Sequence, residues 1–176
     1  MANIFFVSDT HFGHANILKF TRADGSPMRS FASVQEMDDY MVEQWNSVVR
    51  PQDKIYHLGD VAMKKYDIGK VHRCNGHKRL IRGNHDIYPT KIYLQFFEEI
   101  YSMRVLENML FTHIPIHPES LRHDWINVHG HVHNNVPQLH YGPRYLNVSV
   151  EETEYRPLAI EELRQIIAER STLLAA

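Results

Sequence analysis

Short apolar runs that end at acidic, amide or histidine side chains are the feature that most constrains this chain. The runs and the polar residues that follow them are Asn3 to Ser8 before Asp9, Lys54 to Leu58 before Gly59-Asp60, and Arg79 to Ile81 before Gly83-Asn84-His85-Asp86. Such runs are typical of buried strands that enter functional loops. The ends of successive strands in an α/β sheet open on one crevice, where ligands bind. The sequence therefore predicts polar side chains gathered at one sheet edge.

Helices and further strands complete the predicted fold. Ser33, followed three residues later by Glu36, predicts a capped helix that continues toward Val49. Further helices are expected at about 62–74, 90–99 and 160–170, and further strands at 101–106, 109–112, 126–130 and 145–150. We expect an α/β fold, a layered sandwich of mixed sheets flanked by helices. No linker divides the chain, so residues 1–176 are predicted to form a single domain.

Composition limits the environment and the partners. The chain has 176 residues, one cysteine, thirteen histidines and a formal net charge of −2. Neither a disulfide partner for Cys74, nor a signal peptide, nor a long apolar run is found, so we expect a cytoplasmic protein with no membrane contact. No obligate protein partner is indicated. The near-neutral charge gives no general attraction for nucleic acid, but residues 61–82 are basic, which leaves open a nucleic-acid partner or a solvated helix face.

Seven residues at the ends of predicted strands share one kind of chemistry. They are Asp9, His11, Asp60, Asn84, His113, His131 and His133. All are oxygen or nitrogen donors and none is a thiolate. This set suits two divalent first-row ions better than a closed structural zinc site.

These residues fall into five blocks that resemble, in order, the motifs of the calcineurin-like metallophosphoesterase family. The blocks are Asp9-Thr10-His11, Gly59-Asp60, Gly83-Asn84-His85-Asp86, His113 and Gly130-His131-Val132-His133. The match covers Asp9 to His133, most of the chain, and five blocks in the same order make it specific. The chain is most similar to the compact bacterial and phage-type members of that family.

The resemblance implies two metal sites that share one carboxylate. Asp9, His11, Asp60 and His133 would hold one ion, and Asp60, Asn84, His113 and His131 the other. Asp60 would bridge the two ions, because a carboxylate offers two charged oxygens. Manganese is the first expectation for both ions, and iron, zinc, nickel and cobalt are alternatives.

The resemblance also implies hydrolysis of a small phosphoester by hydroxide held between the ions. His85 would be the general acid that protonates the leaving group, with Asp86 orienting its imidazole. Asn84 would also position the substrate. His14 and Arg29 are candidate substrate contacts, although a loop histidine and a solvated arginine are the alternatives. Phosphodiesters, nucleotide or nucleic-acid derived, are expected over monoesters because the chain leaves little room for a cap.

Other interpretations of these residues remain open. Taken singly, Asp9, Asp60 and Asn84 could be turn or helix-capping residues, and a lone histidine could be structural. Five blocks in order weigh against that explanation. A phosphomonoesterase and a non-catalytic metal-binding scaffold of the same fold are the alternative functions.

Overall fold

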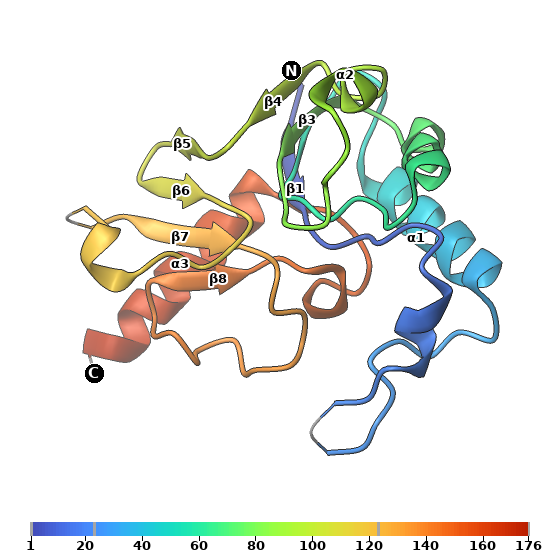
Figure 1. Ribbon diagram of the computed structural model, residues 1–176. Helices are drawn as coiled ribbons and strands as arrows, with labels where there is room; N and C mark the ends of the chain where they lie inside the picture. The colour runs from blue at the N-terminus through green and yellow to red at the C-terminus, as the bar shows by residue number, and fades with distance from the viewer. Residues whose placement is uncertain (1, 23, 123, 176) are drawn as a thin grey trace.

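The computed structural model describes residues 2–22, 24–122 and 124–175. Its first sheet has five strands in the order β4-β3-β2-β1-β9 (Figure 1). They are β1 (Ile4–Val7), β2 (Lys54–His57), β3 (His77–Ile81), β4 (Glu99–Tyr101) and β9 (Leu158–Ala159). β1 to β4 run parallel, and β9 is antiparallel to β1. The carboxyl ends of β1 to β4 therefore lie along one edge of the sheet.

The second sheet is also mixed and meets the first at this edge. It contains β5 (Arg104–Leu106), β6 (Met109–Phe111), β7 (Ile126–His129) and β8 (Tyr145–Asn147), in that order, with only β5 antiparallel to its neighbour. Ser8, just after β1, donates its amide to the carbonyl of Val148, and Val150 donates to the carbonyl of Ser8, both at 3.1 Å. These two hydrogen bonds join the sheets where their parallel strands end.

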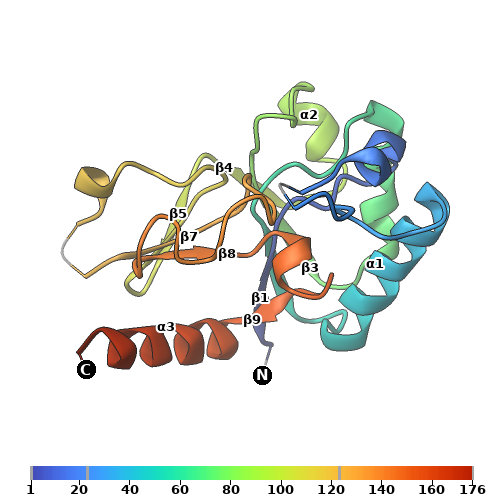
Figure 2. The same ribbon diagram turned by 90° about the horizontal axis from the view of Figure 1, so that it is seen from below.

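An apolar core lies between the two sheets. The ring of Phe6 stacks on that of Phe111 in the other sheet at 4.2 Å and on that of Tyr56 at 5.5 Å. Helix α3 (Ile160–Ala175) runs beside the second sheet and adds the fully buried Leu163 to this core (Figure 2).

A second core covers the opposite face of the first sheet. Helix α1 (Val34–Val48) begins at Ser33, whose hydroxyl accepts a hydrogen bond from the amide of Glu36, as the sequence predicts. Met41 and Trp45 on α1 are buried against this face. The short helix α2 (Thr90–Tyr93) lies beside the sheets, together with the 3₁₀ segments η1 (Ala15–Lys19), η2 (Lys65–Arg73), η3 (Pro118–Ser120) and η4 (Val150–Glu152).

The observed architecture is α/β, with two mixed sheets flanked by helices, as predicted. The helix expected at 90–99 is shorter, because it ends at Tyr93. Phe97 is buried in the core, and the amide of Glu98 donates to the carbonyl of Lys78 at 2.8 Å, so the chain joins the first sheet here. Sheet pairing therefore overrides the helical pattern.

Three other elements differ from expectation. The single strand expected at 101–106 is two strands, β4 and β5, which belong to different sheets. The helix expected at 62–74 is the 3₁₀ segment η2, and the two-residue β9 was not predicted. In the part of the chain that the structure describes, no helix combines the length and apolar character needed to cross a membrane.

Candidate metal centre

The seven predicted ligand residues lie together where the strands of both sheets end. Asp9 follows β1, Asp60 follows β2 and Asn84 follows β3, all in the first sheet. His113 follows β6, and the loop after β7 carries His131 and His133. The centre therefore takes residues from both sheets at the edge where they join.

The charged and imidazole groups form two clusters. Asp9, His11 and His133 make one, and Asp60, His113 and His131 the other, each with candidate ligand atoms within 4.8 Å of one another. Asp60 lies between them, because its Oδ2 is 3.6 Å from Nε2 of His11 and 3.4 Å from Nε2 of His113. This grouping agrees with the partition stated above, while metal binding itself stays a prediction.

Asn84 joins the second cluster through a side-chain contact. Its Oδ1 lies 2.9 Å from Nε2 of His113, and Nδ1 of the same ring donates to the carbonyl of Leu58 at 2.7 Å. The bond to Leu58 fixes the ring so that Nε2 faces Asp60 and Asn84. This is how a backbone carbonyl orients an imidazole toward a metal in proteins.

Strained backbone marks the same loops. A positive φ occurs at five of these residues, which are Asp9 (60°), His11 (47°), Asp60 (58°), His131 (70°) and His133 (49°). A non-glycine residue in this left-handed region costs free energy and persists only where surrounding contacts impose it, as is common at active sites and ligand clamps. The strain at these five residues therefore favours a functional role for them.

Two glycines allow the loops to approach the carboxylates. A Cβ at Gly83 would lie 2.2 Å from Oδ1 of Asp60, and one at Gly130 would lie 2.2 Å from Oδ2 of Asp9. No side chain fits at such distances. The glycines of these two blocks are thus required by the close packing around the carboxylates.

Several buried polar atoms of the first cluster have no hydrogen-bond partner in the described residues. Oδ2 of Asp9 accepts from the amide of His131 at 2.9 Å and from the hydroxyl of Ser149 at 3.0 Å, but its Oδ1 accepts nothing. Both ring nitrogens of the buried His11 are also unpartnered. Buried polar atoms are normally satisfied, so each exception needs an explanation, and a bound cation is one.

The electrostatics of the two clusters are set by burial and by close charges. Burial opposes the charge on Asp60, but the hydrogen bond and charge of His113 outweigh it and lower the Asp60 pKa to about 2. Burial likewise opposes protonation of His113, but Asp60 and Asp9 together raise its pKa to about 9. The burial of His11, aided by the charge of Arg29, holds its pKa well below the ordinary value. Asp60 is therefore anionic at neutral pH.

His85 and its neighbour Asp86 have different surroundings. The His85 side chain is 44% exposed, with Nε2 4.0 Å from Oδ2 of Asp60 and its ring 5.6 Å from that of His11. Asp86 is buried, and its carboxylate accepts from the amides of Asp60, Val61 and Gly83 at 2.8 to 3.1 Å. The hydrogen bonds of the Asp86 carboxylate thus hold the loop that carries Asp60. We expected this carboxylate to orient the His85 imidazole, and the structure shows no hydrogen bond between the two described side chains.

Arg29 does not lie at the surface of the site. It is only 1% exposed, and its guanidinium donates to the carbonyls of Asp9 and Thr10 at 2.5 and 2.8 Å. It also pairs with Glu151 at 2.7 Å, and Glu151 in turn contacts Nδ1 of His133 at 2.9 Å. The alternative that Arg29 is a solvated surface residue is therefore wrong. Because Arg29 is buried against the backbone of the Asp9 loop, its guanidinium is not exposed to contact a substrate.

The position of Glu151 beside the candidate ligands is not predicted from the sequence. Glu151 lies outside the five blocks, in η4, and no local pattern distinguishes it from Glu152. Its position follows from the joining of β1 to β8, which brings η4 beneath the Asp9 loop.

The other histidines divide by burial. His14 is half-buried with its ring 5.6 Å from that of His11, which places it beside the first cluster. His57 is fully buried between the hydroxyl of Thr10 and the amide of Gly59, and burial lowers its pKa to about 3, so it is structural. His123 lies outside the described residues.

Three of the seven Lys and Arg side chains in the basic segment at 61–82 pair with carboxylates. Lys70 contacts Asp38 at 2.7 Å and Asp67 at 2.8 Å. Arg73 contacts Asp39 at 2.6 Å, and Arg79 contacts Glu98 and Glu99 at the edge of the first sheet. These ion pairs leave less unmatched positive charge for a nucleic-acid backbone than the sequence indicates.

Comparison with known proteins gives relatives whose names state no activity. No family model matches the chain. The chain is 33% identical over 179 residues to the uncharacterized protein MJ1445 of Methanocaldococcus jannaschii, across 95% of this chain and 92% of that protein. It is 34% identical over 93 residues to the Gene 66 protein of Mycobacterium phage L5, across 49% of this chain and 41% of the phage protein.

The fold is also similar to that of a solved structure. It is the crystal structure of AQ665, a protein of unknown function from Aquifex aeolicus, with a TM-score of 0.71 and 24% identity, across 94% of this chain and 100% of that one. At this identity the likeness shows a shared fold.

Proposed function

The chain belongs to the same family as MJ1445 of Methanocaldococcus jannaschii, and from the geometry of its two clusters we propose that it is a metal-dependent phosphoesterase with a calcineurin-like metallophosphoesterase fold. The observation that carries this proposal is the placement of Asp60 between two groups of carboxylate and imidazole donors. Turn or capping residues would not need to converge from two sheets on one carboxylate. We propose phosphodiesters as preferred substrates over monoesters.

The residues present fit two divalent first-row ions. Oxygen and imidazole donors suit manganese, iron, zinc, nickel and cobalt, and a cation would compensate the unpartnered Oδ1 of Asp9 and one unpartnered ring nitrogen of His11. Asp9, His11, Asp60 and His133 would hold one ion, and Asp60, Asn84, His113 and His131 the other. Such a pair of ions, when bound, supplies a water of lowered pKa and neutralises the phosphoryl oxygens.

The chain's own residues would supply the proton for the leaving group and hold the candidate ligands in position. The His85 side chain is 44% exposed, so it can reach a bound ester, and an imidazole there can deliver a proton to the departing oxygen. Asp86 fixes the Asp60 loop through three backbone amides. Glu151 orients the ring of His133 from beneath.

The test of this proposal is turnover of bis(p-nitrophenyl) phosphate by protein freed of metal with a chelator and then supplied with Mn²⁺. We expect hydrolysis that depends on added metal and is lost in Asp9→Asn. Asp39→Asn is the matched control, because Asp39 is an exposed carboxylate on α1 away from the clusters. No hydrolysis of mono- or diesters with any of the five metals would contradict the proposal and favour a binding scaffold.

A further inference from the structure

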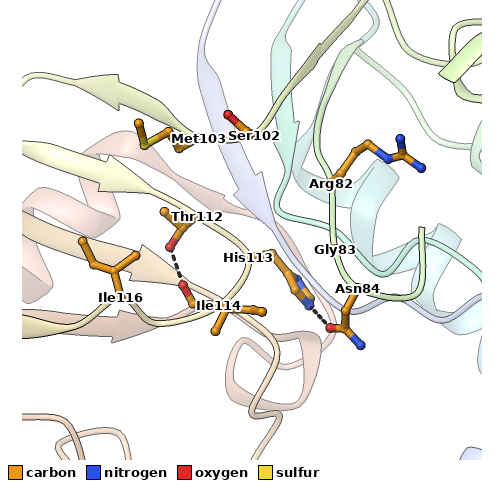
Figure 3. Close-up of a pocket in the computed structure, with 9 residues that line it drawn as sticks. All are labelled: Arg82, Gly83, Asn84, Ser102, Met103, Thr112, His113, Ile114 and Ile116. Carbon is orange, nitrogen blue, oxygen red and sulfur yellow. Dashed lines mark hydrogen bonds between the residues drawn. The ribbon is translucent and has the colours of Figure 1, made fainter. Parts of the chain in front are cut away.

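A cavity of about 450 Å³ opens beside the second cluster (Figure 3). Asn84 and His113 form one end of its lining, and the rest includes Met103, Ile114 and Ile116. Two of these apolar side chains are unusually exposed, because Met103 is 59% and Ile114 48% accessible to solvent. Grouped apolar surface next to ionisable groups is typical of a ligand site.

Two polar side chains of this lining, Thr112 and Arg82, bond to backbone carbonyls. The hydroxyl of Thr112 donates to the carbonyl of Ile114 at 2.7 Å (Figure 3), and the guanidinium of Arg82 donates to the carbonyls of Asp86 and Tyr88. A neighbouring cavity of about 450 Å³ shares Met103 and Ile116 and continues the apolar surface. The occupant that this largely apolar lining favours is an aromatic ring with room for substituents.

The cavity and His85 serve different parts of a substrate. His85 does not line the cavity, and its ring lies against that of His11 in the first cluster. The cavity instead ends at Asn84 and His113 of the second cluster. An ester group that departs beside His85 is therefore not the group held in the cavity.

We propose that this cavity binds an aromatic ring on the ester group that stays attached to phosphorus, which makes the substrate a phosphodiester. This inference rests on the proposed phosphoesterase function. In the reaction the oxygen of water bonds to phosphorus, the P–O bond to the departing alcohol breaks and the departing oxygen takes a proton. The products are that alcohol, the monoester of the aromatic group and the second proton of the water. A monoester has no retained ester group to place there.

The experiment compares three diesters that share the p-nitrophenol leaving group, using Mn²⁺-supplemented protein. The ester group that stays on phosphorus is methyl, phenyl or thymidine attached through its 5′-oxygen. We expect kcat/KM for the phenyl or the thymidine ester to exceed that for the methyl ester roughly tenfold or more, the scale of apolar discrimination in a pocket. A preference for thymidine over phenyl would identify a nucleobase as the ring, and the reverse a simple aryl group. Equal values for all three esters would overturn the inference.

Two variants test the place of binding. Met103→Ala removes apolar contact and Ser102→Trp fills the cavity, so both should lower the ratio of aromatic to methyl kcat/KM. Leu139→Ala, an exposed apolar side chain that does not line the cavity, should keep it. An unchanged ratio in both cavity variants would overturn the inference.

A binding measurement separates this inference from the proposed function. Diphenyl phosphate should bind the Mn²⁺-supplemented protein more tightly than dimethyl phosphate in calorimetry, and Ser102→Trp should remove the difference. That result without turnover of any ester would support the cavity assignment and overturn hydrolysis. Turnover of an ester together with equal binding of the two phosphates would support hydrolysis and overturn the cavity assignment.

Discussion

Arg29 and Glu151 form an ion pair that is almost fully withdrawn from solvent beneath the candidate ligands. Removing one member of such a pair leaves the other charge buried without compensation, which costs about 3–5 kcal/mol. Arg29→Met should therefore lower the free energy of unfolding by about that amount, measured by urea denaturation. Arg156→Met is the control, because the Arg156–Glu162 pair is a third exposed and should cost much less. Equal losses would contradict the buried-pair explanation.

Glu151 also bears on metal binding, because its carboxylate contacts Nδ1 of His133. Residues that orient a ligand typically change metal affinity by about 10- to 100-fold when mutated. Glu151→Gln should weaken binding of one ion by about that factor, measured by titration with Mn²⁺. The neighbouring Glu152→Gln should not change metal affinity, because Glu152 contacts Gln138 instead. Equal affinities for wild type and Glu151→Gln would contradict the orienting role.

His85 gives the sharpest test of mechanism, because it is assigned to proton transfer and not to metal. General acid catalysis is worth about 10²- to 10⁴-fold in rate. His85→Ala should therefore slow an alkyl diester with a poor leaving group by that order, and a p-nitrophenyl diester much less. Metal content, measured by elemental analysis, should stay at the wild-type level. Loss of an ion would make His85 a ligand, and equal slowing of both esters would assign it to charge stabilisation.

The residue scale also shows what sequence can predict. Asp9, Asp60, His131 and His133 were predicted because each follows a recognisable strand. Glu151 and the burial of Arg29 were not found, because their partners are 18 to 122 residues away in the chain and depend on how the sheets join. The carboxylate of Asp86 was assigned to His85 by adjacency, yet hydrogen bonds to the backbone across the loop decide its position.

At the scale of elements, strands were located more reliably than helices. The ends of β1, β2 and β6 lie within a residue of expectation, because apolar runs bounded by polar residues are clear signals. The segment at 90–99 carries a helical pattern, but its hydrogen bonds go to the first sheet from Glu98 onward. The loops after the strands carry the candidate ligands, and Gly83 and Gly130 permit close contacts with Asp60 and Asp9 that a side chain would block.

Gly130 tests this role of the loops. A Cβ there would lie 2.0 Å from the hydroxyl oxygen of Ser8 and 2.2 Å from Oδ2 of Asp9, so the loop after β7 would have to move. Gly130→Ala should lower both the midpoint of thermal unfolding and the content of metal. Gly69→Ala is the control, because its added Cβ would approach nothing closer than 3.6 Å. A Gly130→Ala protein with wild-type stability and metal content would show that this approach is not needed.

At the scale of the whole molecule, the two sheets share one core and one cluster edge. Phe6 stacks on side chains of both sheets, and the hydrogen bonds of Ser8 and Val150 join the sheets beside Asp9. The layered α/β arrangement follows from the order of strands and helices in the sequence. The meeting of the two sheets at Ser8 and Ser149 does not, because no local pattern encodes that pairing.

Metal should therefore stabilise the molecule as a whole, since its proposed ligands come from both sheets. A ligand that binds only the folded state at about 100 times its dissociation constant adds about 2.7 kcal/mol. For a chain of this size that corresponds to a rise of roughly 5–10 °C in the midpoint of thermal unfolding. We expect Mn²⁺ to give this rise in the wild-type protein and a chelator to reverse it. Asp60→Asn should show little rise, because Asp60 lies between the clusters, whereas Asp39→Asn should behave as wild type. An equal rise in Asp60→Asn would mean that the ion binds elsewhere, and the shared-carboxylate arrangement would then be wrong.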